Sequence, residues 1–163
     1  MKKRVLASYD INVDTMAIIP INHFEYDAMI LEGNETYYVK KKPLQLIEGG
    51  CLDGGAEYLG RRESVIHKTG IKKKVPIPIN PNQCIYAFPT HAPSLHECIW
   101  IFSQHIKHVK TNGNDKTQTI ITFNNGKELL VDVSYQVIKK QVYLTAYCIL
   151  RFSPRRFDPR EFG

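Results

Sequence analysis

The stretch that decides the fold is Thr117-Gln-Thr-Ile-Ile-Thr-Phe123, then Asn124-Asn-Gly126, then Lys127-Glu-Leu-Leu-Val-Asp-Val133. An Asn-Gly turn between two apolar runs is the strongest short-range signal of a β-hairpin. Directly after it, Ser134 can cap a helix that runs to about Phe152 and ends before Pro154. A hairpin followed by a helix predicts a domain in which sheet and helix occupy separate stretches of the chain.

The predicted C-terminal helix is amphipathic. Its apolar stripe consists of Ile138, Val142, Thr145 with Ala146, and Ile149. Its opposite face interleaves bases with two tyrosines: Lys139, Lys140, Tyr143, Tyr147 and Arg151. One face therefore packs on the sheet, and the other is offered to solvent or to a partner.

Upstream of the hairpin the sequence predicts several shorter elements. Strands are expected at 16–20, 28–31 and 36–39, a helix at 56–68 that Gly70 ends, one long strand at 98–110 and a polar loop at 111–116. Pro43 is expected to stop the segment before it, and the glycine pairs at 49–50 and 54–55 to flank a flexible stretch. Two prolines restrict 75–79 to the edge of a sheet.

The order of these elements predicts an α+β fold. We expect a β-rich single domain over residues 1–163, with mainly antiparallel strands, one mid-chain helix and one C-terminal helix. The ends, at 1–15 and 153–163, are expected to be loosely ordered.

Composition excludes several classes of protein. Apolar residues make up 43% of the 163 residues and charged residues 23%, which is an ordinary globular mixture. No apolar run approaches the roughly 18 residues of a membrane-spanning helix, and no apolar stretch follows the basic start as in a signal peptide. We therefore expect a cytoplasmic protein whose four cysteines are free thiols.

Neither a metal site nor a catalytic site is indicated. Two cysteines and four histidines lie between Cys84 and His108, but their spacings are not those of zinc ligands. The glycine-rich segment at 49–55 lacks the patterns of phosphate-binding loops, and no nucleophile motif is present. We expect no enzyme activity, no metal and no cofactor.

Charge is distributed unevenly along the chain. The net charge is +6 and the isoelectric point about 9.1. Residues 10–39 hold six acids and no lysine or arginine, whereas the chain from Lys40 onward holds 19 bases against ten acids. A basic remainder of this kind favours a polyanionic partner, and nucleic acid is the first candidate.

The bases form two groups, each on a predicted helix and running beyond its end. The candidate DNA-binding residues are Arg61, Arg62, Lys68, Lys72, Lys73 and Lys74 in the first group, and Lys139, Lys140, Arg151, Arg155 and Arg156 in the second. Such side chains would bind mainly backbone phosphates, which supply most of the affinity for duplex DNA.

Several short sequence segments, taken together, resemble those of the ComK-type competence transcription factors of Gram-positive bacteria. They are Tyr86-Ala-Phe-Pro-Thr-His-Ala-Pro93, Glu97-Cys-Ile-Trp-Ile-Phe102, Tyr37-Tyr-Val-Lys40, Tyr58-Leu-Gly-Arg61 and Phe123-Asn-Asn-Gly-Lys-Glu-Leu129. The resemblance implies a transcriptional activator of DNA-uptake genes that binds paired A/T-rich boxes, mostly through the minor groove. It also implies dimers that assemble into tetramers on double-stranded DNA, close to the nucleoid.

The resemblance further implies a C-terminal extension read by an adaptor and a protease. This chain stops at Gly163 after a short Arg/Pro tail, so either it is truncated or its turnover differs. Two other functions stay open at this point. One is a non-catalytic interaction module of the same circuit that has lost promoter activity. The other is binding of single-stranded RNA or DNA by exposed sheet aromatics. Whichever face of this strand is the core, Trp100 and Phe102 should differ from Ile101 in burial.

Overall fold

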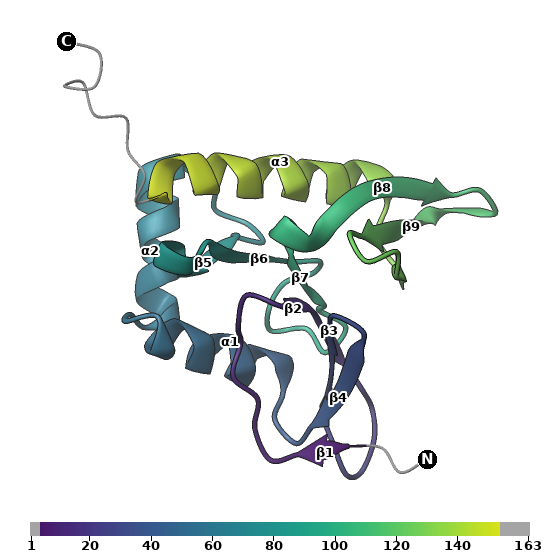
Figure 1. Cartoon of the computed structure of the whole chain (residues 1–163). Helices are drawn as coiled ribbons and strands as arrows, with labels where there is room; N and C mark the ends of the chain where they lie inside the picture. Colours follow the sequence, from purple (N-terminus) through teal and green to yellow (C-terminus); the bar gives the residue numbers. More distant parts are fainter. Residues whose placement is uncertain (1–3, 154–163) are drawn as a thin grey trace.

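A seven-stranded sheet organises the computed structural model, which describes residues 4–153 (Figure 1). Its strand order is β1-β4-β3-β2-β7-β6-β5, and every neighbouring pair is antiparallel except β1 and β4. The strands are β1 (Val5–Leu6), β2 (Thr15–Pro20), β3 (Ala28–Glu32), β4 (Glu35–Val39), β5 (Ile77–Asn80), β6 (Ile85–Pro89) and β7 (Trp100–Phe102).

A second, antiparallel sheet of three strands has the order β10-β9-β8. Its strands are β8 (Ile106–Asn112), β9 (Asp115–Phe123) and β10 (Glu128–Val131). The helices are α1 (Pro43–Asp53), α2 (Tyr58–Thr69) and α3 (Tyr135–Phe152), with 3₁₀ turns at Pro81–Gln83 and Ser103–His105. The prediction of a β-rich α+β domain is confirmed.

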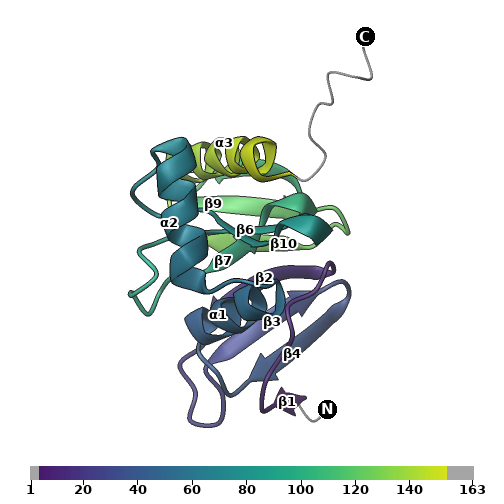
Figure 2. The same ribbon diagram turned by 90° about the vertical axis from the view of Figure 1, so that its left-hand side faces the viewer.

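Two apolar cores lie on opposite faces of the large sheet. Successive side chains of a strand point to opposite faces, so Ile18 belongs to one core, and Ala17 and Ile19 belong to the other. Helices α1 and α2 cover the first core and stand in front of the strands in Figure 2. The small sheet covers the second core, and α3 reaches both, through Cys148 and Ile138.

The chain before β2 was expected to be loosely ordered, yet its described residues are held to the sheet at two places. Strand β1 pairs with β4, Val5 opposite Tyr38. Further along, the Tyr9 hydroxyl donates to the Glu32 carboxylate, and the Asn12 side-chain amide donates to the same carboxylate at 3.2 Å. These polar contacts fasten the segment across the end of β3.

Helix α1 is an element that the sequence reasoning missed. Pro43 begins this helix instead of stopping the chain, since proline at the first helical position has the required φ and needs no hydrogen-bond partner. One glycine of each pair is required by close packing, whereas a Cβ on Gly49 or Gly55 would meet nothing within 4 Å. A Cβ on Gly54 would lie 2.3 Å from the Ile79 carbonyl oxygen, and one on Gly50 would lie 2.9 Å from Ile11 Cδ1.

The prediction of one long strand at 98–110 is wrong. The chain leaves the large sheet after β7, turns through Ser103–His105 and enters the small sheet as β8. The polar loop predicted at 111–116 is correspondingly shorter, because Asn112 pairs with Asp115 and only two residues connect β8 to β9. A continuous run of β-type residues hides a change of sheet, because both halves have the same local preference.

The remaining elements follow the sequence closely. Helix α2 ends at Gly70, β5 lies at an edge of the large sheet, and the Asn-Gly turn joins β9 to β10 as predicted. The Ser134 hydroxyl accepts a hydrogen bond from the Val137 amide at 3.4 Å and caps α3. The buried face of α3 is rotated from the predicted stripe, and consists of Ile138, Gln141, Thr145 and Cys148.

Candidate nucleic-acid interface

Three consecutive lysines lie in the loop that joins α2 to β5, which we call the lysine loop: Lys72, Lys73 and Lys74. The loop is fastened to α3 by a buried side chain. The Gln141 amide, 3% exposed, donates through Nε2 to the carbonyl of Lys74 at 2.9 Å and to that of Pro89 at 3.0 Å. Because both amide hydrogens are used, α3 determines where the lysines are presented.

Two open hollows flank the lysine loop, and all three lysines line each of them. The hollow between the loop and α3 has a volume of about 570 Å³ and also includes Lys140. The hollow on the other side has a volume of about 540 Å³ and includes Arg62 of α2. The structure thus brings five of the predicted bases together, and we call them the basic junction: Arg62, Lys72, Lys73, Lys74 and Lys140.

Acidic groups at the basic junction are already engaged. Asp132 lines the second hollow, and its carboxylate accepts a hydrogen bond from Gln118 Nε2 at 2.7 Å. Glu63 lies 3.9 Å from the Arg62 guanidinium, with side chains 72% and 35% exposed. An exposed ion pair of this length contributes little to stability and is readily exchanged for another anion. The junction therefore keeps an excess of positive charge.

The exposed face of α3 continues from the junction. Lys139 Nζ lies 5.6 Å from the ring centre of Tyr135 and 5.9 Å from that of Tyr143, which are cation–π distances. Tyr143 is 63% exposed and Tyr147 44% exposed. This face offers flat rings beside positive charge, as the sequence predicted.

At the far end of α3 the two helices that carry the predicted bases meet. Lys68 Nζ of α2 lies 4.5 Å over the Phe152 ring, and Arg151 is exposed one residue before it. This contact brings Lys68 of α2 to the C-terminal end of α3, where Arg151 also lies.

Arg61 has a different position from the other predicted bases. Its Nη2 donates to the Gly54 carbonyl at 2.8 Å, and its Nε is buried without a hydrogen-bond partner. The guanidinium thus closes the turn between α1 and α2. Arg155 and Arg156 lie outside the described residues.

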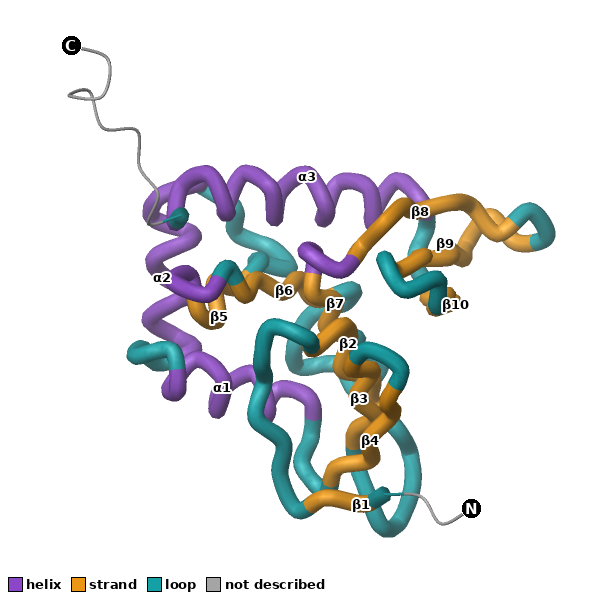
Figure 3. Tube along the Cα trace, viewed as in Figure 1, coloured by secondary structure: helices purple, strands orange, loops and turns teal. Residues whose placement is uncertain are grey.

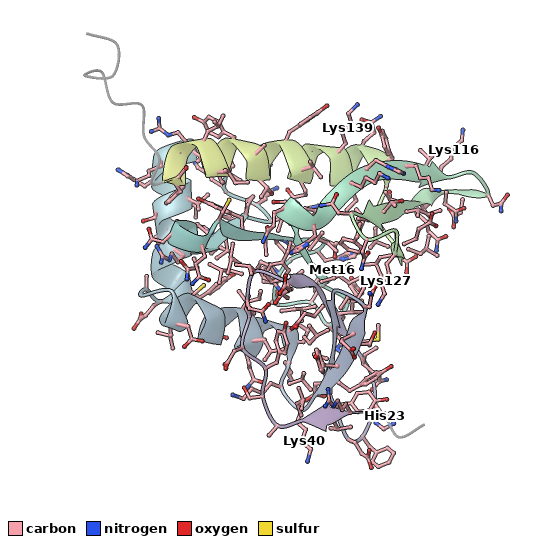
Figure 4. The ribbon with its side chains drawn as sticks, in the orientation of Figure 1. Met16, His23, Lys40, Lys116, Lys127 and Lys139 are labelled. Atoms are coloured by element: carbon pink, nitrogen blue, oxygen red, sulfur yellow. The ribbon has the colours of Figure 1, made fainter. Side chains whose placement is uncertain are left out.

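A further set of bases lies on β8 and β9, which sequence reasoning did not include. Lys107 and Lys110 on β8 and Lys116 on β9 are exposed. Helix α3 packs against both strands, and Lys116 and Lys139 point the same way from their elements (Figure 4). The three bases are visible in the sequence, but the assignment of 98–110 to one strand obscured where they would lie.

Acidic residues gather at the other end of the molecule. The strands β1 to β4 and their connections, residues 4–42, hold six acids and four bases, and we call them the acidic lobe. The rest of the described chain, 43–153, holds 13 bases and eight acids. Lys40 lies at the far end of this lobe from Lys139 in Figure 4, and it lines a hollow together with Glu25 and Asp27.

Metal ligation, thiol ionisation and membrane spanning can each be assessed for the described residues. No group of three or more His, Cys, Asp and Glu side chains among residues 4–153 is arranged to hold a metal ion. Burial raises the pKa of the Cys51 and Cys148 thiols to about 12 and that of Cys98 to about 11, which keeps them protonated at neutral pH. In the same part of the chain no helix is long and apolar enough to cross a membrane.

The sheet aromatics are not available for base stacking. Trp100, Ile101 and Phe102 are 1%, 0% and 0% exposed, so the expected difference in burial along β7 is wrong. The reason is that β7 is a central strand with an apolar core on each face. The single-strand mechanism through these rings therefore has no exposed surface to use.

Comparison with known proteins shows which family the chain belongs to. The ComK protein family matches residues 6–156 of the chain. The Competence transcription factor of Bacillus subtilis (strain 168) is 35% identical over 154 residues, which cover 92% of this chain and 78% of that protein. No solved structure matches. Since the family match spans nearly the whole chain and this relative is aligned over most of both proteins, the chain belongs to the ComK family.

Proposed function

We propose that the protein is a regulator of competence transcription that binds double-stranded DNA at A/T-rich boxes, mostly through the minor groove. Family membership and the name of the Bacillus subtilis relative support the regulatory role. The basic junction supports the DNA contact, because affinity for a duplex comes largely from lysine and arginine on backbone phosphates. No catalytic step belongs to this function.

The separation of charge within the fold is the observation that carries the proposal. Five predicted bases, far apart in sequence, line two adjoining hollows between α2 and α3. Most acids of the first forty residues lie in the acidic lobe instead. A duplex placed along α3 meets positive charge, and the acidic lobe faces away from its phosphates.

Each predicted base receives a role in this arrangement. The basic junction and Lys139 hold phosphates beside the N-terminal half of α3, and Lys68 and Arg151 extend the contact toward its C-terminal end. Arg155 and Arg156 continue it along the chain. Arg61 supports the junction indirectly, by closing the turn that precedes α2.

Ionic strength provides the first test. Fluorescence anisotropy with an A/T-rich duplex should show affinity falling about a thousandfold between 50 and 200 mM salt if five or six phosphates are neutralised. A G/C-rich duplex of equal length should bind more weakly but with a similar slope. Affinity that does not depend on salt concentration, or no binding of either duplex at low salt, would contradict the proposal and favour the interaction module without promoter activity.

Base analogues test which groove is read. An inosine·cytosine pair presents the same minor-groove groups as A·T but the major-groove groups of G·C. A box rebuilt with inosine·cytosine pairs should therefore keep most of the preference over a G/C-rich duplex. If the rebuilt box behaves like the G/C-rich duplex, the readout is in the major groove.

We also propose that the protein acts as a dimer that forms tetramers on paired boxes, as the family resemblance implies. Light scattering coupled to size exclusion measures this directly. A duplex with one box should carry two chains, and a duplex with two boxes four. One chain per box would contradict the oligomeric part of the proposal and leave the DNA contact intact.

A further inference from the structure

The hairpin formed by β8 and β9, which we call the arm, ends in a small polar tip. All three strands of the small sheet are paired as far as one row of residues, which is Thr111, Thr119 and Val131. Beyond this row, Asn112 pairs with Asp115 across Gly113 and Asn114, and residues 116–118 have no partner across the strands. In Figure 3 the tip projects clear of the helices and of the large sheet.

The tip, residues 112–118, contains no apolar side chain: Asn112, Gly113, Asn114, Asp115, Lys116, Thr117 and Gln118. It therefore contributes nothing to either core, and a two-stranded hairpin gains little stability by itself. A polar segment held away from the body of a protein in this way presents donors and charge to a partner.

Hydrogen bonds inside the tip give it one shape. The Asn112 side chain donates through Nδ2 to Gln118 Oε1 at 2.9 Å. Thr117 donates to Asp115 Oδ1 twice, from its hydroxyl at 2.6 Å and from its backbone amide at 2.9 Å. The Asp115 carboxylate is thus turned toward Thr117.

We propose that the tip of the arm enters the minor groove of the duplex, with Asn114 and Lys116 as the side chains that reach its floor and edge. This inference rests on the proposed DNA-binding function and assigns its groove-reading element. Both side chains are exposed. Asparagine and lysine donate hydrogen bonds, and the minor groove of A·T pairs presents only the acceptors N3 and O2.

The tip needs a groove that widens when the protein binds. Paired residues of an antiparallel hairpin lie about 5 Å apart between Cα atoms, and the van der Waals radii of the backbone atoms add about 3–4 Å, so the tip is wider than the roughly 6 Å minor groove of B-DNA. Gly113, at the turn, adds no side chain to that width. Widening of the groove on bending, as other minor-groove proteins induce, provides the remaining room.

The position of the arm relative to α3 supports the same geometry. Helix α3 packs against β8 and β9, and Lys116 and Lys139 point in the same direction (Figure 4). A duplex that lies on the exposed face of α3 therefore comes within reach of the tip. Phosphates beside the groove would meet Lys107 and Lys110, which are exposed nearer the base of the arm.

The first experiment removes the two reading side chains. The double variant Asn114→Ala/Lys116→Met, which leaves no side-chain donor at either position, should lower the preference for an A/T-rich over a G/C-rich duplex at least fivefold, and weaken binding to the G/C-rich duplex by only about twofold. Lys127→Met is the matched control, since Lys127 follows the other turn of the same small sheet. It should change both affinities less than twofold.

Two results would overturn the inference. One is an unchanged preference in the double variant, and the other is an equal loss on both duplexes. Each differs from failure of the proposed function, in which the unmodified protein would bind neither duplex. Circular dichroism of the variant checks that its fold is retained, and the exposure of both side chains makes that retention the expected result.

The second experiment locates the tip directly. Thr117→Cys in a Cys84→Ser background places a single exposed thiol at the tip without replacing either reading side chain, because Thr117 is exposed and Cys51, Cys98 and Cys148 are buried. An iron chelate attached there should cleave the two strands with the offset toward their 3′ ends that marks minor-groove attack. An offset toward the 5′ ends, or no cleavage of a bound duplex, would overturn the assignment.

Discussion

Two runs of three lysines occur in this chain, Lys40-Lys41-Lys42 and Lys72-Lys73-Lys74. By sequence they are equivalent, and each lies between two elements of secondary structure. The fold places them in opposite surroundings. Lys40 shares a hollow with Glu25 and Asp27 of the acidic lobe, whereas the second run lies between Arg62 and Lys140.

The difference shows how the fold, rather than the number of bases, makes a binding surface. A lysine beside carboxylates has its field cancelled within a few ångströms, whereas neighbouring bases add their fields. The second run is also tied to α3, because the Gln141 amide donates to the Lys74 carbonyl. Each of the following changes tests one part of this contrast.

The largest expected effect comes from neutralising one run at a time. Lys72→Gln/Lys73→Gln should weaken duplex binding about tenfold and reduce the salt slope by about 2, because two phosphate contacts are lost. Lys40→Gln/Lys41→Gln makes the same change of charge at two exposed positions of the acidic lobe. Affinity measured by anisotropy should change less than twofold in this second double variant. Equal losses of affinity in the two double variants would contradict the difference proposed between the two lysine runs.

A smaller effect is expected from releasing the lysine loop. Gln141→Leu leaves the carbonyls of Lys74 and Pro89 without their donor and should lower the free energy of unfolding by about 1–3 kcal/mol. We expect about fivefold weaker binding as well, since the lysines lose their fixed position. Gln136→Leu, at an exposed position of the same helix, is the control. Urea unfolding and anisotropy together would show whether positioning contributes to affinity.

The two adjacent arginines are expected to have different roles, one in stabilising the fold and the other in contacting DNA. Arg61→Met removes the hydrogen bond to the Gly54 carbonyl and should lower the free energy of unfolding by about 1–2 kcal/mol, with little change in DNA affinity. Arg62→Met should do the opposite, weakening duplex binding about threefold at unchanged stability. A larger binding loss in the Arg61 variant would mean that this guanidinium reaches the duplex.

Local sequence signals predicted much of the fold. The Asn-Gly turn, the Ser134 cap and Gly70 at the end of α2 act within a few residues, so their effect is visible without the rest of the chain. Helix α1 was missed because Gly50 and Gly54 indicated flexibility, whereas the approach of Ile79, which is distant in sequence, is what requires them. The prediction of one strand at 98–110 was wrong for a similar reason, because the local sequence does not determine which sheet a strand residue joins.

The sequence indicated which bases the candidate site contains, but not how they are arranged in space. The sequence placed bases on α2 and α3, and the structure brings Arg62, the lysine loop and Lys140 together. It could not separate Arg61 from Arg62, because the partner of Arg61 is a backbone carbonyl at the end of an unpredicted helix. The arm was also missed, because Lys107, Lys110 and Lys116 are spread along two strands and do not form a cluster in the sequence.

The smallest expected effect concerns the one acid at the tip of the arm. Hydrogen bonds from Thr117, first from its hydroxyl and then from its amide, lower the pKa of the Asp115 carboxyl, so the group is ionised throughout the neutral range. Asp115→Asn removes a negative charge and keeps an oxygen that accepts both bonds. If the tip lies against DNA, affinity should rise about twofold, because a repulsion from phosphate is lost. Asp14→Asn, an exposed change in the acidic lobe, should leave affinity unchanged. Equal increases in the two variants would reflect net charge alone and would place the tip away from the duplex.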